Sequence, residues 1–245
     1  MTTRIRLDLA LVQRGLAPTR ARARDAIRRG CVTVDGRVAA SPAMAVGDGA
    51  VLAVDDPAGR YVSRAALKLV AGLAHFGYPT EGRMALDIGA STGGFTEVLL
   101  AGGAARVHAV DVGHGQLHPR IARDPRVVSI EGLNARDIAA THLSGPVDAV
   151  VADVSFISLR LALPPALALA SPGAWGVFLV KPQFEVGREH VGKGGLVRDA
   201  ARARQAADDI AGWLADEIGW TVDGIADSPI AGGDGNREYV LGARK

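Results

Sequence analysis

Apolar and polar positions at the start of the chain follow a pattern typical of short elements. Two helices are expected, one ended by Gly15 and one capped by Thr19 and ended by Gly30. A strand over residues 31–38 follows, with an Asp-Gly turn at its centre. These elements predict a small α+β domain over residues 1–58.

After a linker at residues 59–62 the pattern lengthens. A helix over residues 63–77, capped by Ser63, is expected first, and an amphipathic helix over 199–219 comes late in the chain. Strands alternating with helices predict a mostly parallel sheet with helices on both faces. We therefore predict an α/β domain over residues 63–245 that closes with a β-hairpin. The expected parallel strands are "MALDIG", "RVHAVDV", "RVVSIEG", "VDAVVADVSF" and "GVFLVKPQF".

Residues 161–180 carry no charge over 20 positions, which is long enough to suggest a membrane span. Pro164, Pro165 and the turn at 171–173 interrupt this stretch. We interpret it as a short helix, a turn and a buried strand, "WGVFLV".

Composition indicates a globular protein of a reducing compartment. Of the 245 residues 48% are hydrophobic, and Cys31 is the only cysteine, which excludes an internal disulfide and a cysteine metal cluster. The beginning, "MTTRIRLDLA", lacks the apolar core of a secretion signal. A cytoplasmic protein is expected.

Charge is distributed unevenly around a net value of +2. The first 60 residues hold ten arginines and six acidic residues, whereas 18 of the 28 basic residues and 20 of the 26 acidic residues follow. Arg20, Arg24 and Arg28 share one face of the second helix, where only Asp25 is acidic, so we expect no acidic partner to neutralise them. Arginine forks suit phosphates, so this face predicts RNA or DNA binding, with a solvated helix face as the alternative.

The stretch "LDIGASTGGFTEVLL" combines an acidic residue, Asp87, with a glycine loop, and Asp111 ends the next apolar run. In an open α/β sheet such loops bind ligands beyond the carboxyl ends of the strands, and the second acid receives ribose hydroxyls. The loop departs from the dinucleotide fingerprint, and a carboxylate there would repel a pyrophosphate. The ammonium group of S-adenosylmethionine would suit it; a purely structural turn remains the alternative.

Lysine is rare in this chain, and two lysines stand at suggestive places. Lys68 is the only lysine before residue 181, and Lys181 ends the apolar run "WGVFLV". Asp153 ends another such run, and Glu238 begins the last predicted strand. Lysine can release or steer a proton when desolvated, whereas arginine cannot. An exposed helix face and an exposed edge are the alternatives for Lys68 and Glu238.

The motifs "YVSRAALKL", "ADVSFISL", "VKPQFEVG" and "GNREYVL", with the glycine loop, resemble the TlyA / haemolysin A family of RNA methyltransferases. The resemblance implies an RNA-binding domain of the ribosomal protein S4 type, followed by a Rossmann-like methyltransferase domain similar to the FtsJ 2′-O-ribose methyltransferases. It implies methyl transfer from S-adenosylmethionine to the 2′-hydroxyl of a cytidine in ribosomal RNA. The catalytic tetrad then falls on Lys68, Asp153, Lys181 and Glu238. We expect Lys181, oriented by Asp153, to draw off or steer the proton of the hydroxyl, and Lys68 and Glu238 to hold the ribose.

The resemblance also implies the binding residues. The cofactor would be bound by Asp87, Gly89, Ala90, Ser91, Thr92, Gly93, Gly94, Phe95, Asp111, Val112, Asn134 and Asp153. RNA would be bound by Arg6, Arg20, Arg22, Arg24, Arg28, Arg29, Arg64, Lys193 and Arg198. No metal is expected. Two departures are Ser91-Thr92, where FtsJ proteins carry Ala-Pro, and Ser41-Pro42, where S4 domains often carry Lys-Pro, at the expense of one phosphate contact.

Two other functions stay open at this stage, a membrane-active haemolysin and a non-catalytic RNA-binding protein. The sequence does not specify the modified nucleotide, the ribosomal subunit or the oligomeric state. We expect residues 184–199, rich in glycine and charge, to be a mobile loop that orders on RNA through Lys193 and Arg198.

Overall fold

The computed structural model describes residues 4–245. The first three residues of the stretch "MTTRIRLDLA", in which we expect no secretion signal, lie outside the described residues. The chain forms two compact units, one ending at Arg60 and one covering Tyr61–Lys245. The finer domain limits, 1–58 and 63–245 with a linker between them, remain a proposal. Each unit is described by itself.

The first unit contains the expected helices and turn. Thr19 Oγ1 accepts a hydrogen bond from the Arg22 backbone N–H and so caps the second helix. Asp35 and Gly36, both at positive φ, make the tight turn between two strands. The elements are β1 Ile5–Arg6, α1 Leu7–Gln13, α2 Arg20–Arg28, β2 Val32–Val34, β3 Arg37–Val38, β4 Ala45–Val46 and β5 Leu52–Val54. Strands β1 and β4 form one small sheet, and β3, β2 and β5 form another.

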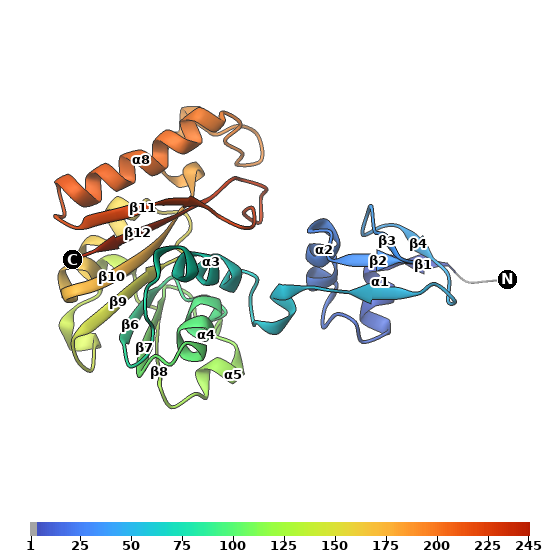
Figure 1. The fold of residues 1–245 in the computed structure, drawn as a ribbon, viewed down its shortest axis with the longest axis horizontal. Coiled ribbons are helices and arrows are strands. Elements are labelled where there is room, and N and C mark those ends of the chain that lie inside the picture. Colours follow the sequence, from blue (N-terminus) through green and yellow to red (C-terminus); the bar gives the residue numbers. More distant parts are fainter. Residues whose placement is uncertain (1–3) are drawn as a thin grey trace. The chain divides into compact units, whose positions relative to one another are not determined.

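The second unit is built on a seven-stranded sheet (Figure 1). Its strands are β6 Met84–Ile88, β7 Arg106–Asp111, β8 Val127–Glu131, β9 Val147–Ala152, β10 Ala170–Val180, β11 Thr221–Asp227 and β12 Tyr239–Arg244. They lie in the order β11-β12-β10-β9-β6-β7-β8, with β12 antiparallel between β10 and β11 and all other neighbours parallel. The predicted mostly parallel sheet and closing hairpin are confirmed.

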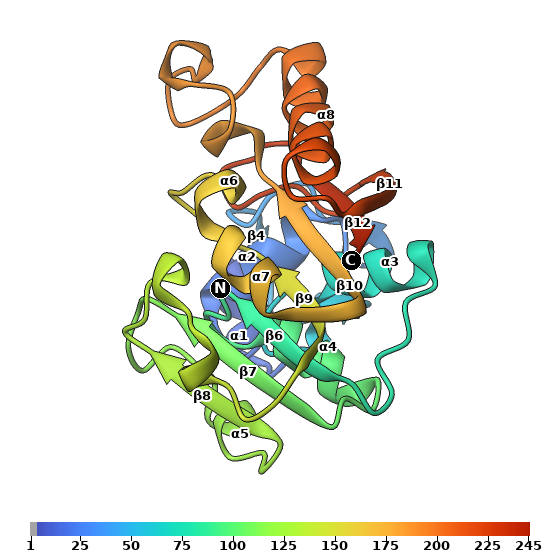
Figure 2. The same cartoon turned by 90° about the vertical axis from the view of Figure 1, so that its left-hand side faces the viewer.

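Helices cover both faces of this sheet, because alternate strand residues are apolar on each side (Figure 2). One face packs against α3 Ala66–Phe76, α4 Gly94–Ala101 and α5 Pro119–Ala122. The other packs against α6 Leu159–Ala162, α7 Pro164–Leu169 and α8 Ala200–Asp216. Short 3-10 helices lie at Pro57–Arg60, Ala135–Asp137, Ala140–His142, Pro182–Phe184 and Arg188–His190.

The helix expected over residues 63–77 is shorter than predicted. It begins at Ala66, and Ser63 Oγ accepts only from the Ala65 N–H in the turn before it. Ser63 packs instead against the glycine loop, since a Cβ on Gly94 would lie 2.9 Å from the Ser63 Cβ. The loop therefore holds this segment out of the helix.

The uncharged stretch 161–180 is confirmed as helix and buried strand, but the expected turn at 171–173 lies within β10, where the pairing with β9 shifts register. It contributes the end of α6, all of α7 and β10, and Leu163, Leu167 and Phe178 are fully buried in the core. Across residues 4–245, no helix is long and apolar enough to cross a membrane.

The topology identifies the edge at the carboxyl ends of the parallel strands as the one where a ligand is expected to bind, called here the ligand edge. From β6, the chain proceeds to β7 and β8 on one side and returns to β9 and β10 on the other. The crevice at such a reversal, beyond the carboxyl ends of the strands, is where ligands bind in open α/β sheets. Because β12 is antiparallel, its beginning lies at this same edge, opposite the end of β10.

Candidate active site

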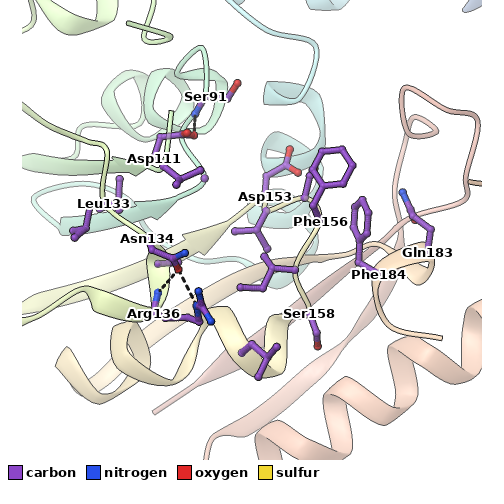
Figure 3. A pocket seen from close by; sticks show the side chains of 18 of the residues that line it. Ser91, Asp111, Leu133, Asn134, Arg136, Asp153, Phe156, Ser158, Gln183 and Phe184 are labelled. Atoms are coloured by element: carbon purple, nitrogen blue, oxygen red, sulfur yellow. Dashed lines mark hydrogen bonds between the residues drawn. The ribbon is translucent and has the colours of Figure 1, made fainter. Parts of the chain in front are cut away.

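Two adjoining cavities lie at the ligand edge. The larger one has a volume of about 930 Å³ and extends from the glycine loop to Asn134, Phe156 and Phe184 (Figure 3). The smaller one, about 210 Å³, lies between the glycine loop, Ser63 and Lys181. Both are lined by Gly89, Ser91, Asp153 and Ser155. The larger volume is in the range of sites for nucleoside-sized ligands.

Polar groups in the larger cavity are held by backbone contacts. The Asp111 carboxylate accepts hydrogen bonds from the backbone N–H groups of Ser91 and Gly113, each at 2.7 Å. The Asn134 Oδ1 accepts from the Arg136 backbone N–H and Nε, each at 3.1 Å (Figure 3). Asn134 therefore offers its amide N–H groups, and Asp111 its carboxylate oxygens, to a ligand.

The glycine loop lies close to Asp153 at the ligand edge of the sheet because its residues adopt unusual backbone conformations. Gly89 has φ +81°, and a Cβ there would lie 2.8 Å from the Asp153 carbonyl oxygen. Ser91 is one of only three non-glycine residues with positive φ among the described residues. These conformations let the loop pass directly against the strand that carries Asp153.

Asp87, which we expected to bind the cofactor, lies beneath the loop and lines neither of the two cavities. Its side chain is fully buried and accepts a hydrogen bond from Thr96 Oγ1 at 2.6 Å. Burial, opposed by the Thr96 bond, raises the pKa of this carboxyl to about 7. Its position inside β6, one residue before the strand end, explains the difference.

The four residues of the expected tetrad are brought together. Lys181 Nζ lies 2.5 Å from Asp153 Oδ1, and Lys68 Nζ lies 2.5 Å from Glu238 Oε2 and 3.9 Å from Asp153 Oδ2. All four side chains are at most 14% exposed. Burial raises the pKa of the Glu238 carboxyl, and the neighbouring Lys68 opposes the rise. Two ammonium groups and two carboxylates thus share one desolvated cluster.

The fold explains this convergence. Asp153 directly follows β9 and Lys181 directly follows β10, which are parallel neighbours. Glu238 directly precedes β12, and the register pairs Val180 with Tyr239, so Glu238 meets Lys181 at the same edge. Lys68 comes from α3, which packs over β10 and β12. Neither Lys68 nor Glu238 is among the residues lining the cavities, although we expected both to hold the ribose.

Ser155 is a functional candidate that the sequence analysis missed. Lys181 Nζ donates a hydrogen bond to Ser155 Oγ at 2.8 Å, and both residues line the small cavity. Lys181 is therefore held from two sides, by Asp153 and by Ser155. Ser155 could have been found from the sequence, because it lies two residues after Asp153, the acidic residue that ends an apolar run.

Phe156 is a second missed residue. It is 92% exposed and has φ +65°, a conformation that costs an L-residue roughly 1–2 kcal/mol. Its ring and that of Phe184 lie with centroids 5.3 Å apart on the wall of the larger cavity (Figure 3). Strain retained for an exposed aromatic side chain at a cavity indicates a role in binding.

The other expected cofactor residues divide between the two cavities. Val112 lines the larger one; Ala90, Thr92, Gly94 and Phe95 line the smaller one. Gly93 faces the apolar side chains of Leu117 and Ile121 instead. No group of His, Cys, Asp and Glu side chains within residues 4–245 is arranged to hold a metal ion.

The basic face of α2 has an acidic partner, contrary to our expectation. Asp8 of α1 is fully buried and pairs with Arg20 at 3.1 Å and Arg24 at 2.8 Å. Our expectation rested on the acids of α2 alone, whereas Asp8 belongs to α1, the helix packed against α2. Arg6 also pairs with Asp8, at 3.1 Å.

The remaining expected RNA-binding residues differ in their surroundings. Arg29 is 15% exposed and pairs with Asp25 and Asp56, and Arg22 donates to the Ala58 carbonyl. Arg28, Lys193 and Arg198 are exposed, and Arg64 is half-buried.

Within the expected mobile loop, Gly187 and Arg188 line the larger cavity, and Asn236 holds the backbone at Gly195 and Val197. Its mobility stays a prediction.

Comparison with known families and proteins identifies both units. Residues 61–245 match the FtsJ-like methyltransferase family, and residues 5–52 match the S4 domain family. A Mycobacterium tuberculosis protein named 16S/23S rRNA (cytidine-2′-O)-methyltransferase TlyA is 49% identical over 245 residues, covering all of this chain and 91% of that protein.

Two further relatives carry another name. A Brachyspira hyodysenteriae protein named Hemolysin A is 39% identical over 96% of this chain and 98% of its own length. A solved structure from Streptococcus thermophilus with a provisional hemolysin name is 38% identical, with a TM-score of 0.77 over all of this chain and 90% of that chain. Names of both kinds therefore occur among proteins of the same architecture.

Proposed function

Because the chain belongs to the TlyA family, in which an S4 domain precedes an FtsJ-like methyltransferase domain, we propose that it methylates ribosomal RNA. The methyl group goes from S-adenosylmethionine to the ribose 2′-hydroxyl of a cytidine. The partner is a ribosomal subunit or its RNA, and the place of action is the cytoplasm.

One observation carries this proposal. Lys181, Asp153, Lys68 and Glu238 form a closed charge cluster at the small cavity, which adjoins a nucleoside-sized cavity. Such an arrangement suits a reaction in which a neutral hydroxyl must be held and its proton removed.

The residues of the larger cavity fit S-adenosylmethionine. Asp111 offers carboxylate oxygens to ribose hydroxyls, and Asn134 offers N–H donors to the acceptor nitrogens of an adenine. Val112 and Leu133 add apolar wall for the base. When bound, the cofactor supplies a methyl group on a good leaving group, so the protein has mainly to position the acceptor.

Lys181 is the residue proposed to handle the proton. Its Nζ is held by Asp153 and Ser155, which leaves one position of the nitrogen for the 2′-hydroxyl in the small cavity. As the ribose oxygen gains the methyl group, it loses its proton to Lys181 Nζ, which must first have released a proton of its own to solvent. Lys68 and Glu238 pair with each other and fix Asp153, in place of the ribose contacts expected from the sequence.

Phe156 is the proposed contact for the target nucleotide. RNA-modifying enzymes unstack the nucleotide on which they act, and exposed aromatic rings receive such bases by stacking. Phe156, beside Phe184 at the rim of the site, presents a ring of this kind. The S4 domain would supply phosphate contacts that bring the RNA to the site.

The test is methyl transfer from labelled S-adenosylmethionine to separated ribosomal subunits by the full-length protein. We expect labelled 2′-O-methylcytidine after digestion of the RNA to nucleosides. Label on a base, or on protein, would contradict the assigned acceptor. No transfer with any subunit, despite tight RNA binding, would favour the non-catalytic RNA-binding alternative.

The haemolysin alternative receives no support from residues 161–180, because most of the apolar side chains of this stretch are buried in the core. Release of a dye from phospholipid vesicles by the purified protein, without methyl transfer, would reverse this assignment.

A further inference from the structure

Asp8 is a buried carboxylate at the contact between α1 and α2. Its side chain is 0% exposed, yet it accepts hydrogen bonds from three guanidinium groups. Arg6 donates from Nε and Nη2 at 3.1 and 3.2 Å, Arg20 from Nη2 at 3.1 Å, and Arg24 from Nε at 2.8 Å. The bond to Arg6, with those to Arg24 and Arg20, holds the pKa of this carboxyl well below its usual range.

The cluster keeps a surplus of positive charge and of donors. One carboxylate meets three guanidiniums, so two positive charges remain uncompensated. The arginines are 48%, 47% and 43% exposed, and each guanidinium carries five N–H donors, of which Asp8 takes one or two. Solvent therefore reaches donors from three side chains gathered around one point.

We propose that Asp8 is a positioning residue that gathers Arg6, Arg20 and Arg24 into one binding site for a phosphodiester of the RNA. This inference rests on the proposed RNA substrate and deepens it. Arginine side chains lose rotamer entropy when they are immobilised. Asp8 imposes that order before RNA arrives, so less ordering remains for the binding step.

This role reverses the expectation from charge alone. Removing a carboxylate from an RNA-binding surface adds positive charge and should tighten binding. Asp8→Asn instead frees three arginines from their shared partner, and the site loses its shape. We expect RNA affinity to fall about tenfold, the equivalent of one charge-assisted hydrogen bond. The dependence on salt should become less steep, because fewer counterions are displaced by ordered contacts.

The same unit offers matched controls. Asp48 is exposed, and Asp48→Asn makes the same charge change away from the cluster. Arg37 of β3 is exposed, so Arg24→Lys and Arg37→Lys make the same exchange inside and outside the cluster. Lysine keeps the charge but lacks the fork by which Arg24 meets both Asp8 and a phosphate.

The experiment measures binding of the full-length variants to a ribosomal RNA fragment by fluorescence anisotropy at several salt concentrations. We expect weaker binding and a shallower salt dependence for Asp8→Asn and Arg24→Lys, and affinity equal to or above wild type for Asp48→Asn and Arg37→Lys. Equal or tighter binding by both cluster variants would overturn the inference, as would a wild-type protein that does not bind RNA.

Thermal unfolding followed by circular dichroism accompanies each variant. If Asp8→Asn unfolds the first unit, the comparison of Arg24→Lys with Arg37→Lys decides, because both side chains reach solvent and neither exchange disturbs the core. Wild-type protein that binds RNA with this pattern but transfers no methyl group would refute the proposed function and leave the inference standing.

Discussion

Lys181 is the side chain on which the proposed chemistry depends most directly. Lys181→Ala should lower the single-turnover rate about 10²- to 10⁴-fold, the usual contribution of a positioned acid–base group. Lys181→Arg should restore little, because a guanidinium keeps its proton. The measurement is methyl transfer with saturating RNA and cofactor. Cofactor affinity is the control, since the glycine loop is untouched; near-normal rates in either variant would make Lys181 structural.

Ser155 should act on the rate and leave binding unaffected. Ser155→Ala removes one of the two partners of Lys181 Nζ, so we expect kcat to fall about tenfold, the value of one hydrogen bond to a charged group, with little change in KM. Ser155→Thr keeps the hydroxyl and should recover most of the rate. If both variants raised KM equally and kept kcat, Ser155 would contact the RNA instead of orienting the lysine.

Phe156 combines a strained backbone conformation with an exposed aromatic ring. Phe156→Gly accepts the φ of +65° without strain, so its melting temperature should be no lower than that of wild type. Both Phe156→Gly and Phe156→Ala should raise KM for RNA tenfold or more, because stacking of one base contributes about 1–3 kcal/mol. A lower melting temperature for Phe156→Gly with unchanged KM would show that the ring serves folding.

At this scale, the sequence predicted the residues that end apolar runs. Lys181 and Asp153 were found because charge after a buried strand is conspicuous. Lys68 was noted as a rare lysine and Glu238 as the start of the last strand, and the resemblance assigned both to the tetrad. Their pairing could not be predicted, since it depends on β12 lying beside β10. The contacts of Asp8 were missed because two of its partners, Arg20 and Arg24, belong to another helix, 12 and 16 residues away.

At the scale of an element, the glycine loop and β6 depend on how Asp87 is buried. Its pKa rises from 3.8 to about 7 in the folded protein, so the folded state binds a proton more tightly than the unfolded chain. Stability should therefore fall as pH rises between about 4 and 7, and the loss is complete above pH 7. Asp87→Asn removes this dependence while keeping the shape of the side chain.

The melting temperatures of wild type and Asp87→Asn, measured from pH 5 to pH 8 without cofactor, check this prediction. The variant should gain on the wild type as pH increases. Calorimetric titration with S-adenosylhomocysteine is the companion measurement, and affinity should change little because Asp87 does not line a cavity. Loss of cofactor binding in Asp87→Asn would restore the direct contact expected from the sequence.

Elements were predicted well where one physical signal dominates. Strands β6, β9 and β10 are nearly continuous apolar runs, and α2 has its capping Thr19. The start of α3 was misplaced because Ser63 looks like a cap. Its contact with Gly94, 31 positions later, is tertiary and leaves no local pattern.

For the whole molecule, phosphate contacts are assigned to the first unit and methyl transfer to the second, so the two should be separable. Ser41 is exposed, and the Pro42 carbonyl accepts the Asp8 backbone N–H, which places Ser41 beside the arginine cluster. Ser41→Lys should tighten RNA binding and steepen its salt dependence by about one counterion. Cofactor affinity should not change.

The control for this gain is Thr221→Lys, which adds the same charge where β11 begins, at the sheet edge opposite the ligand edge. Filter binding of labelled RNA over a range of salt concentrations compares the two variants. An equal gain in both would mean that overall charge, and not the position beside Asp8, sets the affinity.

The place of Glu238 in the chain has a consequence for biosynthesis. This residue enters the tetrad on β12, which lies between β10 and β11, and its pair with Lys68 joins positions 170 residues apart. The ribosome must therefore have released β12 before this strand can insert between β10 and β11. A nascent polypeptide whose β12 has not yet left the ribosome lacks the fourth member of the tetrad, so it cannot carry out the proposed methylation.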